Sequence, residues 1–375
     1  MRIDGSWLHH PGTQALCRAL QSGGFQALFV GGCVRNALIG AAVNDIDLAT
    51  DANPETVTKL AQNDGFKVVP TGIDHGTVTV IANGVPHEVT TFRQDVETNG
   101  RHAVVRFSTS VAEDAARRDF TMNALYARAD GEIVDPLGGL PDLMARRVRF
   151  VGDPVQRITE DYLRILRFFR FFAWYGDQSQ GLDAEGLAAC AAHSAGLETL
   201  SRERVGAELT KLLSAPDPSM AVASMAQSGV LAAALPGAEA RALPVLVHLG
   251  MAEWVPRLAV LGGAAESLRL ARSDLAQLNL IRAEVGALRS AQELGYRYGP
   301  EVARAVILCR AALLETPPPE GWQAATQQGA EAVFPVAATD LMADFQGKAL
   351  GDKLRALEQA WIDSGFSLTK PDLLG

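Results

Sequence analysis

The sequence lacks the features that would assign it to a membrane or secreted class. No run of 18 apolar residues is uninterrupted, and charged side chains divide the most apolar stretch, 242–265, so we expect no membrane-spanning helix. The first ten residues contain no basic segment followed by an apolar core, so we expect no signal peptide. These two absences predict a cytoplasmic protein.

Cysteine is scarce, with four residues in a chain of 375. The four lie far apart and form no C-x-x-C pair, which argues against a zinc knuckle and against a redox motif. We therefore expect inert, reduced thiols. The phosphate-binding pattern G-x-x-x-x-G-K-[ST] is also absent, so the chain is not a P-loop protein.

Positive charge is in deficit, because the formal net charge is −9 at pH 7. On its own this argues against a nucleic-acid partner. The deficit is uneven, since residues 93–170 carry 13 basic and 12 acidic side chains and all 13 basic residues are arginine. The planar arginine fork suits phosphates and base edges, although by counting alone a solvated charged surface is the better explanation.

The chain does contain enough apolar surface to fold, with 48% hydrophobic residues, and its length predicts two to four domains. Up to about residue 150 the pattern alternates between strands and helices, and from about 153 it is helical only. We therefore predict an α/β N-terminal domain and an all-helical remainder. The expected strands are 27–30, 45–49, 77–81 and 87–91, and the expected helices are 34–39, 53–62 and 153–175.

A glycine pair marks the first predicted strand-to-helix turn. Gly31 and Gly32 end the strand, and Arg35 follows in the first turn of the helix. Such a pair lets the backbone approach a phosphate, although a tight turn explains it as well. An arginine in the first turn opposes the helix dipole and so requires another reason to be there.

Two carboxylates lie on the next predicted strand. Asp45 and Asp47 are two residues apart, so their side chains point to one face. Carboxylates that close repel each other unless a cation joins them, and Mg²⁺ prefers oxygen ligands. A polar edge strand would explain an isolated D-x-D pattern. Here the pattern follows Gly-Gly-x-x-Arg by a dozen residues, and this position favours a metal site.

Arginines recur in two later motifs. Arg117 and Arg118 precede Asp119 and suit phosphate or ribose contacts, with a surface ion pair as the alternative. The long predicted helix then carries charged side chains every three residues: Asp161, Arg164, Arg167 and Arg170. Because this helix is otherwise strongly apolar, its arginines need an anionic or polar partner, unless the helix is simply amphipathic with an exposed arginine face.

In their order, these motifs resemble those of the tRNA nucleotidyltransferases, the CCA-adding enzymes of the bacterial and eukaryotic class, and of the related bacterial poly(A) polymerases. The matching segments span about residues 29–213 and read GGCVRNALIG, DIDLAT, TTFR, RRDFTMNAL, DPLGG, EDYLRILRFFRF and SRERVGAELTKLL. The resemblance implies a nucleotidyltransferase head or palm domain at 1–150, a helical neck with a base-reading helix at 151–215, and a helical body and tail that bind tRNA at 216–375.

The resemblance also implies roles for the first motifs. Asp45 and Asp47 would be catalytic and bind Mg²⁺, and Glu88 is a candidate third carboxylate. Where the family usually has aspartate after the motif arginine, this chain has Asn36, which places a supporting hydrogen bond in question. The residues that would contact the nucleotide phosphates and sugar are Gly32, Arg35 and Arg118.

For the later helix, the resemblance implies that Asp161 and Arg164 read the incoming base, side by side on one helix. An aspartate accepts a hydrogen bond from the amino group of C or A, and an arginine donates to their ring acceptors. Such a pair can replace a nucleic-acid template for CTP and ATP. Arg167 and Arg170 would support the triphosphate and the reading pair.

The resemblance thus implies addition of C, C and A to the 3′ end of tRNA, with Mg²⁺, CTP and ATP and no obligate protein partner. The alternatives are a poly(A) polymerase, an enzyme adding only CC or only A, and a non-catalytic RNA-binding protein. Segment 93–105 resembles the flexible loop of complete CCA-adding enzymes. None of the seven histidines is followed by aspartate, so we expect no metal-dependent phosphohydrolase activity.

Overall fold

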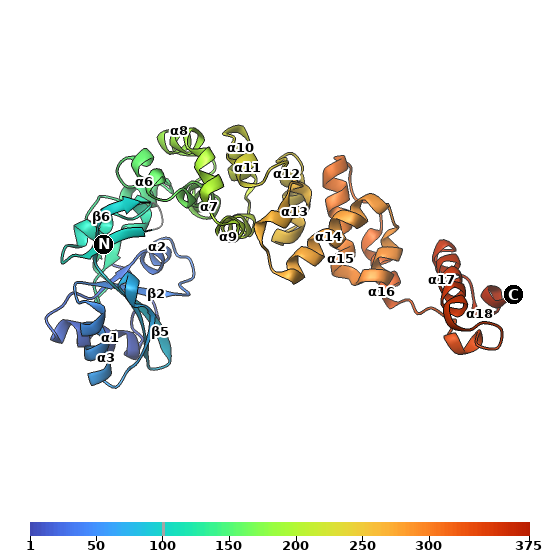
Figure 1. Cartoon of the computed structure of the whole chain (residues 1–375), viewed down its shortest axis with the longest axis horizontal. Coiled ribbons are helices and arrows are strands. Elements are labelled where there is room, and N and C mark those ends of the chain that lie inside the picture. Colours follow the sequence, from blue (N-terminus) through green and yellow to red (C-terminus); the bar gives the residue numbers. More distant parts are fainter. Residues whose placement is uncertain (100–101) are drawn as a thin grey trace. The chain divides into compact units, whose positions relative to one another are not determined.

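The computed structural model describes residues 1–99 and 102–375, which form two compact units, Met1–Pro236 and Gly237–Gly375. The first unit contains the sheet and the helices that follow it, and the second is helical (Figure 1). This confirms the predicted α/β domain followed by a helical remainder. The finer division into head, neck, and body with tail stays a prediction.

The strands of the first unit belong to two sheets. In the described residues the larger sheet has the order β3-β4-β5-β2-β1-β8-β9, in which β2 and β5 are parallel and the other neighbours antiparallel. The strands are β1 (Leu28–Val30), β2 (Ile46–Thr50), β3 (Lys67–Gly72), β4 (Thr77–Ala82), β5 (Val85–Thr91), β8 (Tyr126–Ala127) and β9 (Ile133–Val134); the separate pair is β6 (Arg93–Asn99) and β7 (His102–Phe107).

Helices surround this sheet and continue the chain beyond it. Helices α1 and α3 pack against β4. The helices of this unit are α1 (Pro11–Ser22), α2 (Gly32–Leu38), α3 (Pro54–Asn63), α4 (Val111–Ala116), α5 (Leu140–Met144), α6 (Pro154–Glu160), α7 (Leu163–Tyr175), α8 (Ala184–Ala192), α9 (Arg202–Leu213), α10 (Ser219–Gln227) and α11 (Val230–Ala234).

Local sequence signals explain several of these elements. The Asn53 side chain accepts a hydrogen bond from the Thr56 N–H at 2.8 Å and so caps α3. Asn83 and Gly84 both have positive φ, 49° and 83°, as a tight hairpin turn between β4 and β5 requires. The start of α3 and the two strands around this turn agree with the expected helix 53–62 and the expected strands 77–81 and 87–91.

The long helix predicted over 153–175 is wrong, because the chain forms two helices there, α6 and α7. At the break Asp161 is extended, with φ −154° and ψ 105°. Its carboxylate accepts the N–H of Leu163, the first residue of α7, at 3.1 Å. Aspartate often caps a helix in this way, and here the cap interrupts a pattern whose apolar spacing continues through both helices.

An aromatic cluster joins α7 to the sheet domain. Phe120 and Phe150 lie 5.0 Å apart between ring centroids, and Phe150 and Phe168 lie 5.3 Å apart. Phe171, one turn further along α7, lies 5.0 Å from Phe120. Because these side chains are buried, they fix α7 against the segments that contain Phe120 and Phe150.

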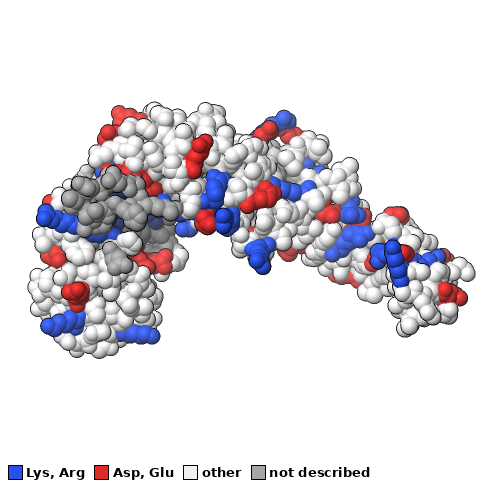
Figure 2. All heavy atoms as spheres, viewed as in Figure 1, with Lys and Arg blue, Asp and Glu red and all other residues white. Residues whose placement is uncertain are grey.

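The second unit is built from helices with a mixed charge surface. On the face drawn in Figure 2, basic and acidic side chains are interspersed over this unit. No helix of the described residues combines the length and the apolarity that crossing a bilayer requires. The helices are α12 (Leu243–His248), α13 (Trp254–Leu261), α14 (Arg272–Ala287), α15 (Ala291–Leu314), α16 (Trp322–Glu331), α17 (Gly347–Asp363) and α18 (Lys370–Leu374).

All four cysteines are free and buried, as inert thiols should be. Burial raises the pKa of Cys17 to about 12 and that of Cys33 to about 11. At neutral pH both are therefore protonated and poorly nucleophilic.

Candidate active site

The glycine turn brings an arginine to the start of α2. Gly31 has a φ of 68°, which favours glycine, and its N–H donates to the Leu125 carbonyl at 3.1 Å. A Cβ at this position would lie 3.4 Å from Nη1 of Arg118. Gly32 begins α2 directly after this turn. Of the two glycines predicted to approach a nucleotide, Gly31 therefore lies beside Arg118, and a Cβ at Gly32 would lie 3.9 Å from Nη2 of Arg35.

Arg118 is held by a carboxylate and a phenol. It donates to the Asp114 carboxylate at 3.0 Å and to the Tyr126 hydroxyl at 3.0 Å, and that hydroxyl donates to Asp114 at 2.7 Å. Although burial acts to raise it, the Arg118 guanidinium and the Tyr126 hydroxyl hold the pKa of Asp114 below its ordinary value. The predicted phosphate-contacting arginine is thus fixed from two sides.

Arg35 is buried at the other side of the turn, with 6% of its surface exposed. Its guanidinium donates to the Asn123 side-chain oxygen at 2.6 Å, to that of Asn36 at 2.9 and 3.1 Å, and to the Tyr175 hydroxyl at 2.9 Å. The family usually has aspartate at position 36, and the asparagine in this chain placed a supporting hydrogen bond in question. The Asn36 side-chain oxygen accepts from Arg35 and so supplies such a bond.

The acidic residues meet where β2 and β5 run parallel. Asp47 on β2 is paired in register with Glu88 on β5, and Asp45 lies just before β2 rather than within it. Burial raises the pKa of Asp47 to about 6; Glu88 and Asp45 also raise it, and Arg118 lowers it. The structure therefore brings the two predicted aspartates and Glu88 into one acidic region.

This acidic region suits a divalent cation only with help from a substrate. Among the described residues, no three histidine, cysteine, aspartate or glutamate side chains are close enough to hold a metal ion by themselves. Magnesium is commonly bound by one or two carboxylates together with substrate phosphates. The half-buried Asp47 carboxylate, with acidic neighbours and an arginine nearby, fits that kind of site.

The predicted base-reading residues line a pocket of about 330 Å³. The lining residues come from β6, the segment after α4, the break between α6 and α7, α7 itself and α9: Arg93, Arg117, Arg118, Asp119, Asp161, Leu163, Arg164, Arg167 and Arg204. The structure thus brings Asp161, Arg164 and Arg167 together with Arg118 around one pocket. Arg170 is absent from this lining.

The expectation that Asp161 and Arg164 lie side by side on one helix is wrong. Asp161 precedes α7 and accepts a hydrogen bond from Arg204 of α9 at 2.7 Å. Arg164 instead donates to Glu160, at 2.5 Å, and to the Arg157 carbonyl at 2.8 Å. Each predicted reading residue is therefore oriented by a different neighbour, and sequence reasoning missed both Glu160 and Arg204.

The other two arginines of α7 are held by buried carboxylates. Arg167 donates through Nε to Asp119 at 2.8 Å, and Arg170 donates to Glu208 of α9 at 2.6 Å. Asp119 also accepts from the Asn123 side chain at 3.0 Å. The three-residue spacing of the arginines was visible in the sequence, but their carboxylate partners lie 38 and 48 residues away in the chain.

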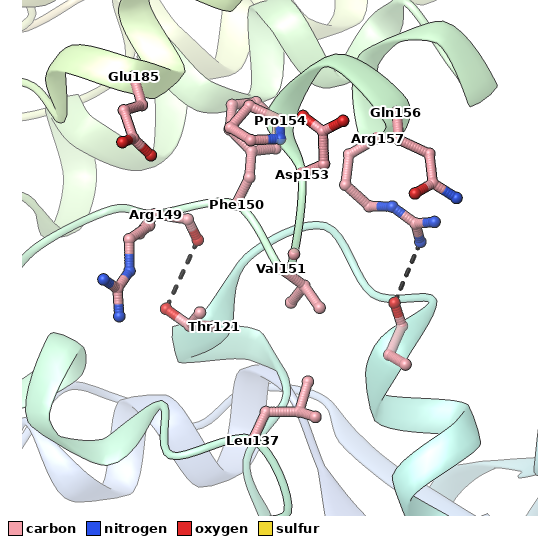
Figure 3. A pocket seen from close by; sticks show the side chains of 12 residues that line it. Thr121, Leu137, Arg149, Phe150, Val151, Asp153, Pro154, Gln156, Arg157 and Glu185 are labelled. Carbon is pink, nitrogen blue, oxygen red and sulfur yellow. Dashed lines mark hydrogen bonds between the residues drawn. The ribbon is translucent and has the colours of Figure 1, made fainter.

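A larger pocket, of about 580 Å³, lies near the start of α6 (Figure 3). Its arginines are already engaged: Arg149 pairs with Asp142 at 2.9 Å, and Arg157 donates to the Ala116 carbonyl at 3.1 Å. None of the predicted site residues lines it. Its size alone therefore does not make it the active site.

The parallel pairing of β2 and β5 around an acidic region, together with an arginine-lined pocket beside it, defines a nucleotidyltransferase head domain. The family model described as the poly A polymerase head domain matches residues 27–149. A second model, described as the probable RNA- and SrmB-binding site of polymerase A, matches residues 182–256. The chain belongs to the tRNA nucleotidyltransferase and poly(A) polymerase family, whose members generally use divalent metal ions.

Similar proteins point to one branch of this family. The chain is 41% identical over 203 residues to the human protein named CCA tRNA nucleotidyltransferase 1, mitochondrial, an alignment covering 54% of this chain and 47% of that protein. It is 42% identical over 210 residues to the CCA-adding enzyme of Bacillus pumilus, covering 55% and 51%. The alignments thus span about half the length of these curated relatives.

Solved structures resemble the chain over more of its length. The crystal structure of the Bacillus stearothermophilus CCA-adding enzyme in complex with CTP has a TM-score of 0.74 at 27% identity, covering 94% of this chain and 92% of that one. The Thermotoga maritima CCA-adding enzyme complexed with tRNA has a TM-score of 0.67 at 18% identity, covering 95% and 94%. The second likeness concerns the fold alone.

Proposed function

We propose that this protein adds C, C and A to the 3′ end of tRNA, using CTP and ATP and releasing pyrophosphate. The observation that carries the proposal is the pocket in which Asp161 and Arg164 lie with Arg118, in the same unit as the Asp45 and Asp47 carboxylates. The similarity to CCA-adding enzymes and to a CTP complex supports it.

Base choice is the step that this pocket would perform. The Asp161 carboxylate would accept from the amino group of cytosine or adenine, and the Arg164 fork would donate to ring acceptors of either base. Uracil and guanine present a different pattern of hydrogen-bond donors and acceptors at these edges, so they would not pair with Asp161 and Arg164 in this way. Arg204 and Glu160, which bond to these two side chains, would keep their polar groups directed into the pocket.

Asp45 and Asp47 would hold Mg²⁺ together with the nucleotide phosphates, and Glu88 is a candidate third carboxylate. When bound, the metal ion would activate the terminal 3′-hydroxyl of the RNA and stabilise the leaving pyrophosphate. Arg35, Arg118 and the turn at Gly32 would bind the phosphates and the sugar. The supporting feature is the acidic region around Asp47, whose negative charge a divalent cation would offset.

The neighbouring arginines of α7 act through other side chains in this proposal. Arg167 would line the nucleotide pocket while bonded to Asp119, and Arg170, bonded to Glu208, would hold α7 against α9. Both would therefore support the reading residues, and Arg170 would do so without touching the nucleotide.

A poly(A) polymerase is the second candidate, because it shares these catalytic parts. The family-model descriptions name polymerase A, whereas the relatives and structures reported above are CCA-adding proteins, and this favours tRNA as the substrate. Enzymes adding only CC or only A stay alternatives.

The loop predicted at 93–105 falls on β6 and β7, and its residues 100–101 lie outside the described residues. A cytoplasmic location stays a prediction, since vertebrate relatives are named mitochondrial.

The test supplies each labelled triphosphate, singly and together, to a tRNA that lacks its 3′ end. With Mg²⁺ the protein should add C, C and A and then stop, and a chelator should abolish incorporation until Mg²⁺ is restored. Long A tails on generic RNA with ATP alone would identify a poly(A) polymerase. RNA binding without incorporation of nucleotides would indicate a non-catalytic RNA-binding protein.

A further inference from the structure

Arg35 differs from five other arginines of the site in having neutral partners only. Those five are each bonded to a carboxylate in the pairs Arg118–Asp114, Arg164–Glu160, Arg167–Asp119, Arg170–Glu208 and Arg204–Asp161. Within the described residues, no carboxylate lies within ion-pair distance of Arg35. The nearest link is indirect, since Asn123 accepts from Arg35 and donates to Asp119.

Tyr175, the last residue of α7, makes two kinds of contact with this guanidinium. Its hydroxyl accepts a hydrogen bond from Nη2 of Arg35 at 2.9 Å. Its ring centroid lies 4.0 Å from the guanidinium carbon, which is a close cation–π distance. Phe171, one turn earlier, lies 5.2 Å from the same carbon. Helix α7 therefore supplies both an acceptor and an aromatic face to an arginine of α2.

These contacts orient the guanidinium without neutralising it. A buried cation with neutral partners keeps its full charge and has lost most of its hydration. A bound polyphosphate would offset that cost, and attraction between the two charges is strong at a site shielded from water. An arginine paired with a carboxylate would offer less net charge to the same ligand.

We propose that Tyr175 is a positioning residue that holds the Arg35 guanidinium in the direction of the triphosphate of the incoming nucleotide. This rests on the proposed function in so far as the ligand is CTP or ATP. Tyr175 would act on the phosphates and not on the base, so it would affect both nucleotides equally. It would also make triphosphate binding depend on the docking of α7 against α2.

The test is equilibrium binding of CTP, ATP and tRNA to the full-length protein. Tyr175→Leu removes both contacts and should weaken CTP and ATP binding by the same factor, about ten-fold. Tyr175→Phe keeps the aromatic face, and its affinity for CTP and ATP should fall by about three-fold only. Binding of tRNA and the unfolding temperature should stay close to wild type. Tyr296→Phe, which removes a phenol hydrogen bond to Glu358 in the second unit, is the matched control and should leave nucleotide binding unchanged.

Comparison of the two Tyr175 variants separates positioning from a structural role. Because Tyr175→Phe keeps the ring 4.0 Å from the guanidinium carbon, it should bind CTP and ATP about three-fold more tightly than Tyr175→Leu, while the two variants unfold at similar temperatures. Equal losses of affinity in the two variants, unequal losses for CTP and ATP, or a loss shared by tRNA binding would overturn the proposal. Because nucleotide binding is measured directly, the result holds whether or not the wild type adds C, C and A.

Discussion

At the scale of single residues, the candidate site is organised by pairing arginines with buried carboxylates. Glu160, Asp119 and Glu208 each bond to an arginine of α7. Removing one partner of such a pair leaves the other charge buried and unpaired, which is strongly destabilising. Because the proposed function also gives arginines of α7 a role in ligand binding, a useful experiment has to measure stability and binding separately.

Asp47→Asn should abolish nucleotide incorporation while leaving tRNA binding nearly intact. Loss of a metal ligand removes several kcal/mol of transition-state stabilisation, so we expect a fall of about 10³-fold or more in the rate. The substitution also removes a carboxylate that faces Glu88 across the β2–β5 pair, so the unfolding temperature should not fall. Asp64→Asn, at an exposed position of the same domain, is the control. Near-normal incorporation by Asp47→Asn would refute the metal-ligand assignment.

Arg164→Ala should relax base choice. A good bidentate contact to a base is worth about 1–3 kcal/mol of discrimination, so UTP misincorporation relative to CTP should rise about ten-fold or more. The measurement is the C-to-U incorporation ratio, taken together with the melting temperature, because Glu160 loses one of its two arginine partners and some stability will be lost as well.

The matched control for this variant is Arg289→Ala. Like Arg164, Arg289 is bonded to glutamate, here Glu284 and Glu293, but it lies in the second unit. The substitution Arg289→Ala should lower the melting temperature and leave the C-to-U incorporation ratio unchanged. If Arg164→Ala behaves in the same way, the Glu160–Arg164 contact is structural and the base-reading hypothesis fails.

At the scale of helices and strands, local signals predicted α3 and the strands β1, β2, β4 and β5, and they missed the break at Asp161. A cap at Asn53 and a turn at Asn83 are each decided within a few residues, so the sequence is sufficient there. The partner of Asp161 is Arg204, 43 residues away, and no local pattern identifies such a contact. The direction of Asp161 and Arg164 depends on these distant partners, which is why the motif predicted the site residues but not their pairing.

The crossing of α15 and α16 gives a prediction at this scale. A Cβ at Gly329 would overlap the Gln292 carbonyl oxygen, and one at Gly295 would overlap that of Thr326. Gly329→Ala should therefore force the helices apart and lower the free energy of unfolding by about 1–3 kcal/mol. Gly286→Ala, on α14, meets nothing within 4 Å and should stabilise by up to about 1 kcal/mol through helix propensity. Denaturant titration of both full-length variants tests this, and equal effects would contradict the packing argument.

At the scale of the whole molecule, the acidic composition bears on the proposed tRNA substrate. The chain carries a net charge of −9, and on the face drawn in Figure 2 both signs are interspersed over the second unit. The sequence could predict a family that handles RNA, but not the surface that contacts it, because a docking surface is formed by side chains from many separate helices. Recognition of tRNA would rest on the shape of an A-form stem and its phosphates.

The salt dependence of tRNA binding separates local contacts from the field of the whole protein. If lysines and arginines of a local surface neutralise about five phosphates, counterion release should lower the affinity about 10²–10³-fold between 50 and 200 mM salt. If repulsion by the net charge dominated instead, added salt would screen it and the affinity would rise, since the Debye length falls to about 10 Å at 0.1 M. We expect the fall, measured by filter binding of tRNA to the wild-type protein, with the unfolding temperature at both salt concentrations as the control. An affinity that rises with salt would show that no local basic surface binds the RNA, and the proposed tRNA substrate would then lose its physical basis.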